Sequence, residues 1–61
     1  MKLYQIRTTF ITETSSLDMY STAVFRDYAA AQEVVANLAS ADVIKEGERI
    51  IRTIVALYLW T

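Results

Sequence analysis

The sequence predicts a small α+β domain in the order β-β-α-β, with an antiparallel sheet packed on one amphipathic helix. Three observations support this fold class: two N-terminal segments alternate apolar and polar residues, a middle segment has helical periodicity, and the last is rich in β-branched and aromatic residues. Apolar residues make up 54% of the 61 residues, with one Gly and no Pro, which is typical of a chain that folds. We expect one domain over residues 1–61.

The first strand is expected between residues 3 and 13. One side of its two-residue period carries Tyr4, Ile6 and Phe10, and the other carries Gln5, Arg7, Thr9 and Glu13. A polar break at residues 14–18 has the length of a hairpin connection. The β-branched and aromatic residues between 19 and 25 then predict a second strand, antiparallel to the first.

The helix is predicted to begin at Tyr28, with Asp27 as its N-cap, because a carboxylate can accept from the free amides of the first turn. One apolar stripe follows the spacing i, i+3, i+4, i+7 and consists of Ala31, Val34, Val35 and Leu38, extended by Tyr28 and Ala41. We expect this stripe to pack on the first strand, and Phe25 to pack under the first turn. Two alternatives remain for the end of the helix: it frays near Ser40, or a short extended piece pairs with the segment that follows.

A turn at Glu46 and Gly47 precedes the third strand, expected over residues 49–61. Part of this segment also fits a helix face, but its β-branched and aromatic content favours a strand. Even positions present Ile50, Ile54, Ala56, Tyr58 and Trp60, and odd positions present Ile51, Val55, Leu57 and Leu59. Both faces of this strand are therefore apolar.

A strand that is apolar on both faces normally has a layer on each side, and one helix can cover only one of them. In one interpretation the strand is central, and Leu3 and Ile11 join it in a minor cluster capped by loops. In the other, which we favour, a partner covers the second face. We expect a homodimer whose interface comprises Ile51, Val55, Leu57, Tyr58, Leu59 and Trp60.

No catalytic, cofactor-binding or metal site is predicted, and we expect a protein that is not an enzyme. The chain has no Cys and no His, which removes disulfides, zinc sites and the usual nucleophile and base pairs. Glu46 and Glu48 flank Gly47 in a predicted turn, and we do not expect two solvated carboxylates there to act as a general acid and base pair. A single Gly does not make a phosphate-binding loop.

The charges argue against a general affinity for nucleic acid, since the net charge is −1 and no basic cluster is present. The alternative function is a small sheet that stacks bases on aromatic residues beside arginines. Its candidates are Tyr4, Tyr20, Tyr58, Trp60, Arg7, Arg49 and Arg52. No membrane segment is predicted, because the apolar C-terminal run of about a dozen residues is too short. We expect a cytoplasmic protein.

The run from Val24 to Ala31, followed by Val34, Val35 and Leu38, resembles the strand-to-helix join of many small phage and prophage proteins. In such proteins a hairpin leads into one amphipathic helix and a last strand closes the sheet. The resemblance implies a regulator or inhibitor that binds a host protein, with the host cytoplasm as its location. It carries over no site residues.

Overall fold

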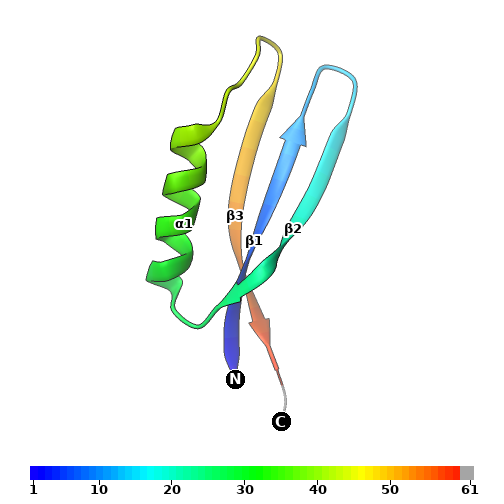
Figure 1. The fold of residues 1–61 in the computed structure, drawn as a ribbon. Coiled ribbons are helices and arrows are strands. Elements are labelled where there is room, and N and C mark those ends of the chain that lie inside the picture. The colour runs from blue at the N-terminus through cyan, green and yellow to red at the C-terminus, as the bar shows by residue number, and fades with distance from the viewer. Residues whose placement is uncertain (60–61) are drawn as a thin grey trace.

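The computed structural model describes residues 1–59 and confirms the order β-β-α-β (Figure 1). The elements are β1 (Lys2–Ile11), β2 (Ser16–Phe25), α1 (Tyr28–Ala41) and β3 (Arg49–Tyr58). The three strands form one sheet in the order β2-β1-β3, and β1 is antiparallel to both neighbours. The helix packs along one side of this sheet (Figure 1).

The central strand β1 pairs differently with its two neighbours. Its register with β3 is unbroken, from Lys2 opposite Tyr58 to Ile11 opposite Arg49. Its register with β2 shifts between Gln5 and Arg7, which marks a bulge. At the bulge the Ile6 N–H donates to Oγ of Ser21 at 3.1 Å, so a side chain replaces the missing ladder bond.

The helix begins at Tyr28, as predicted, but the predicted role of the Asp27 carboxylate is wrong. Asp27 has the extended backbone of an N-cap, with φ −109° and ψ 131°, yet its side chain makes no capping hydrogen bond. Its carbonyl accepts from the Ala31 N–H at 3.3 Å. The helix ends at Ala41, where the Asp42 N–H donates to the Ala39 carbonyl at 3.3 Å.

The turns explain the remaining boundaries. The Thr12 N–H donates to the Ser15 carbonyl at 2.8 Å, so the hairpin is tight and β2 begins before the predicted residue 19. The expected turn before β3 is confirmed: Gly47 has φ +83°, and the Glu48 N–H donates to the Lys45 carbonyl at 3.0 Å. Within the described part of the chain, α1 is too short to cross a membrane.

The core is small because the helix is shorter than the sheet it covers. Fourteen helical residues span about 21 Å, whereas ten strand residues span about 33 Å. Within residues 1–59 only Ile6 and Ala31 are buried, at 2% and 0% exposure. Leu38, predicted to be core, is 43% exposed. The predicted apolar stripe therefore faces the sheet but closes over it only in part.

Candidate interaction surface

The helix lies on one face of the sheet, and the two faces therefore differ in how far they are covered. Arg52 and Ile54 of β3 line a hollow together with Val35 of α1, and the Arg52 guanidinium pairs with the Asp42 carboxylate just after the helix. Even-numbered residues of β3 therefore lie on the helix side. Because side chains alternate along a strand, odd-numbered residues lie on the opposite face, which no described element covers.

The structure divides the predicted interface residues between these faces. Ile51, Val55 and Leu57 lie on the uncovered face, where Leu3 of β1 stands opposite Leu57. They form an apolar stripe along the outer strand, which we call the β3 stripe. Leu59 follows the strand on the same side of the two-residue period and is 48% exposed.

Tyr58 lies on the other face, on the helix side. The Lys2 amine stands 5.6 Å from the centre of the Tyr58 ring and 5.5 Å from that of Tyr4. Tyr4 in turn packs edge-on against Tyr28 of the helix, with ring centres 5.5 Å apart. Trp60, the last member of the predicted set, lies outside the described residues.

The middle of the uncovered face is polar, because β1 contributes Gln5, Arg7 and Thr9 there. The Gln5 amide donates to the Ser21 carbonyl at 2.7 Å, and the Thr9 hydroxyl donates to the Asp18 carboxylate at 2.6 Å. Nε of Arg7 is shielded from water and has no partner within the described residues. The uncovered face is thus a polar band on β1 flanked by the apolar β3 stripe.

The outer edge of β3 presents backbone N–H and C=O groups that are not bonded to β1. The Met1 amine donates to the Leu59 carbonyl at 2.9 Å, and the Leu59 N–H donates to the Met1 carbonyl at 2.8 Å. In an antiparallel ladder such mutual pairs recur at every second residue, so the odd residues of β3 bond to β1. The even residues point their N–H and C=O groups outward: Ile50, Arg52, Ile54, Ala56 and Tyr58.

The Asp42–Arg52 ion pair neutralises the only charge in the middle of β3. The two side chains are 16% and 10% exposed, and Nη2 of Arg52 donates to Oδ1 of Asp42 at 2.8 Å. This hydrogen bond lowers the pKa of the Asp42 carboxyl. Sequence spacing gave no signal for the pair, because its members belong to a loop and a strand whose relative position depends on the fold.

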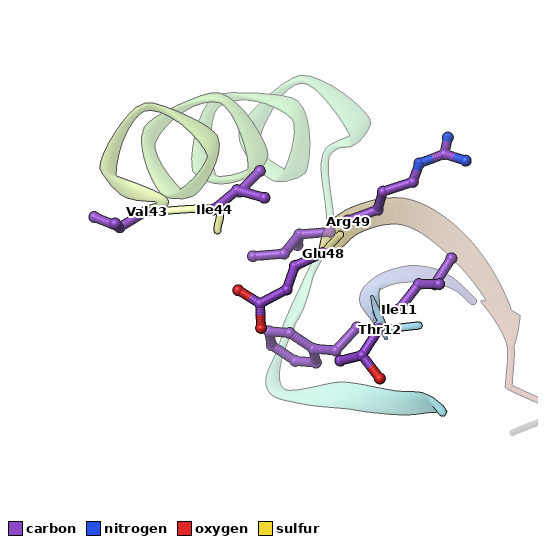
Figure 2. A pocket seen from close by; sticks show the side chains of 8 residues that line it. Ile11, Thr12, Val43, Ile44, Glu48 and Arg49 are labelled. Atoms are coloured by element: carbon purple, nitrogen blue, oxygen red, sulfur yellow. The ribbon is translucent and has the colours of Figure 1, made fainter. Parts of the chain in front are cut away.

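A second apolar surface lies on the helix side, at the hairpin end. A cavity of about 220 Å³ lies here, lined in part by Phe10, Ile44 and Glu48. Figure 2 shows this cavity from close by. Val43 points outward there and is 88% exposed. Leu17 on β2 is 60% exposed. The sequence carries no signal for this surface, because Val43 and Ile44 follow the helix without a periodic pattern.

Within the described part of the chain, the remaining candidate residues do not gather into a chemical site. Tyr20 stands opposite Arg7 on the uncovered face, whereas Tyr4 and Tyr58 lie on the helix side, so these tyrosines do not form one stacking platform. Glu48 stabilises the turn before β3, since its carboxylate accepts a hydrogen bond from the Lys45 N–H at 3.1 Å. Among residues 1–59 no group of carboxylates is arranged to hold a metal ion.

Comparison with protein-family models, with curated proteins and with solved structures finds no match to this chain. The uncovered face and the free edge of β3 therefore carry the functional inference.

Proposed function

We propose that this chain is a non-enzymatic protein-protein interaction module that self-associates through its last strand. The observation that carries the proposal is the large exposed area of the folded chain, which is 4851 Å² at a mass of 6.9 kDa. A folded monomer of this mass exposes about 4,000 Å². The excess of about 850 Å² is close to the roughly 800 Å² that each partner buries in an ordinary protein interface.

The apolar residues that would gain from cover lie along β3. Ile51 is 40% exposed and Leu59 is 48% exposed, and Val55 and Leu57 are half-buried beside them. Full burial of one such side chain contributes about 1.5 to 3 kcal/mol, so even partial additional cover of these four residues in both copies contributes several kcal/mol per dimer. A domain in which only two side chains among residues 1–59 are buried has a small stability of its own, and association would add substantially to it.

The biological class of this module follows from the phage-type resemblance of its strand-to-helix join. We propose a small regulator or inhibitor that binds a host protein. The absence of a catalytic constellation in the sequence, with no Cys and no His, supports a role in binding.

Light scattering and sedimentation at micromolar concentration test self-association. We expect twice the chain mass of 6.9 kDa, falling to a single chain on dilution. Leu57→Glu should give the monomer mass. Val24→Glu is the matched control, because Val24 is an exposed apolar residue on the same face of the opposite edge strand, and it should leave the dimer intact. A monomer mass for the wild type across the range would overturn the proposal.

A further inference from the structure

We propose that the second copy pairs with β3 edge to edge and antiparallel, in a register centred on Ile54, so that the two three-stranded sheets become one. This inference rests on the proposed self-association and specifies its geometry. It assigns the interface to the backbone edge of β3 together with the β3 stripe, and leaves the polar band of β1 in water.

Edge pairing is favoured over stacking of the two uncovered faces. Stacking would bury the polar side chains of Gln5, Arg7 and Thr9 at the centre of the contact, and burying a guanidinium is costly unless it is paired and fully hydrogen-bonded. The apolar residues of this face lie instead on the outer strand, beside its free edge. Edge pairing joins two such stripes in the middle of the enlarged sheet, where side chains of the two copies cover each other's flanks while the outer surface of both stripes stays in water.

The sheet has two edges, and only the β2 edge is interrupted by a bulge. Natural edge strands are protected by bulges, charged residues or proline. The β2 strand has a bulge near Ser21. By contrast β3 is paired without interruption over ten residues, and its one mid-strand charge, Arg52, is neutralised by Asp42. A long, regular, apolar edge of this kind is a template for a further strand.

The direction of the backbone groups selects the register. A two-fold axis normal to the sheet places equivalent faces on the same side, so each residue stands opposite one of the same parity. With Ile54 on the axis, Ile50 stands opposite Tyr58 of the second copy and Arg52 opposite Ala56, and every outward-pointing residue is paired. A centre at Thr53 would place Tyr58 opposite Glu48, beyond the strand.

The same register brings the predicted interface residues together on the uncovered face. Ile51 stands opposite Leu57 of the second copy, and Thr53 stands opposite Val55. These are the pairs without mutual hydrogen bonds, in which side chains approach most closely. Both copies of α1 lie on the other face of the joined sheet.

Engineered cysteines test the register, because the chain has no Cys of its own. In Ile54→Cys the two cysteines stand opposite each other with Cα atoms about 5.5 Å apart, within disulfide range, and we expect a cross-linked dimer under mild oxidation. Ile51→Cys is the control: Ile51 is 40% exposed, but the two copies of residue 51 are about 20 Å apart and should not link. A mixture of Ile51→Cys with Leu57→Cys should link.

A proline variant tests the use of the edge independently. Ala56→Pro removes an outward N–H and no bond to β1, so we expect a folded chain whose dimer dissociation constant rises about tenfold or more. Val24→Pro is the control on the edge of β2 and should leave the dissociation constant unchanged.

The outcomes separate the two proposals. A dimer that survives Ala56→Pro, with Ile54→Cys not cross-linking, would overturn edge pairing while leaving self-association standing. Ready cross-linking of Ile51→Cys alone would overturn the register. A monomeric wild type would overturn both proposals.

Discussion

Truncating Leu38 should cost much less stability than truncating Ile6, although each change to Ala removes three carbon atoms. Ile6 is 2% exposed, so Ile6→Ala loses about 0.8 kcal/mol for each buried carbon and leaves a cavity, for a total of about 3 to 4 kcal/mol. Leu38 is 43% exposed, so only about half of that transfer energy is lost. Water fills the space it leaves, and we expect about 1.4 kcal/mol for Leu38→Ala.

Urea unfolding followed by circular dichroism measures both changes, at one fixed protein concentration because association contributes to the apparent stability. A loss of 3 to 4 kcal/mol is comparable to the whole stability expected of so small a domain. Ile6→Val therefore serves as a milder companion, with an expected loss of about 1 kcal/mol for a single carbon. The cost per carbon removed should be about twice as large at Ile6 as at Leu38.

Equal costs per carbon at the two sites would refute this reasoning. Such a result would mean that the helix closes on the sheet at Leu38, or that a partner covers Leu38 in solution. In either case the helix-side surface at the hairpin end would not be exposed as described.

Three further predictions concern the turns and the ion pair. Hydrogen bonding to Arg52 lowers the pKa of Asp42 in the folded state, so the stability that Asp42 contributes is complete above its ordinary pKa of 3.8 and is lost as the pH falls through the folded value. The stability difference between wild type and Asp42→Asn should therefore shrink from pH 7 to about pH 2 in urea titrations. A constant difference would contradict the pairing. Ser21→Ala should cost about 1 to 3 kcal/mol, since the Ile6 N–H loses its acceptor. Ser40→Ala, on the exposed surface of the helix, is the control and should cost less than about 0.5 kcal/mol. Similar thermal unfolding of the two variants would show that the Ser21 hydroxyl does not stabilise the bulge. Gly47→Ala should cost about 1 to 2 kcal/mol, because φ is +83° and an added Cβ would lie 2.7 Å from Oε1 of Glu13. Gly47→Asn should cost less, because Asn tolerates a positive φ better than Ala. The opposite order would show that contact with Glu13, and not backbone strain, dominates the cost.

Local sequence patterns were sufficient for the elements of this fold. The alternation through Tyr4 and Ile6, the stripe from Ala31 and the single Gly before the last strand are signals that a few neighbouring residues carry by themselves. Their physical basis is the direction of side chains along a strand or a helix, which does not depend on the rest of the chain. The start of the helix at Tyr28 was predicted correctly from Asp27 as the N-cap residue, although the Asp27 side chain makes no capping hydrogen bond.

The identity of the central strand was decided by tertiary structure. The sequence left two interpretations of the last strand, because both of its faces are apolar: a central strand, or a strand whose second face a partner covers. In the structure β1 occupies the centre and β3 the edge, so the interpretation as a central strand is wrong. Strand order depends on which partners compete for the edge of β1, and this competition leaves no periodic signal.

The candidate site depended on the fold in the same way. The sequence identified Ile51, Val55 and Leu57 as one face of a strand in need of cover. Only the ladder between β1 and β3 showed that the even residues turn their backbone groups outward, and only the fold brought Asp42 to Arg52. Side-chain periodicity is a local property of the chain, whereas a free edge exists only once every other strand has been placed.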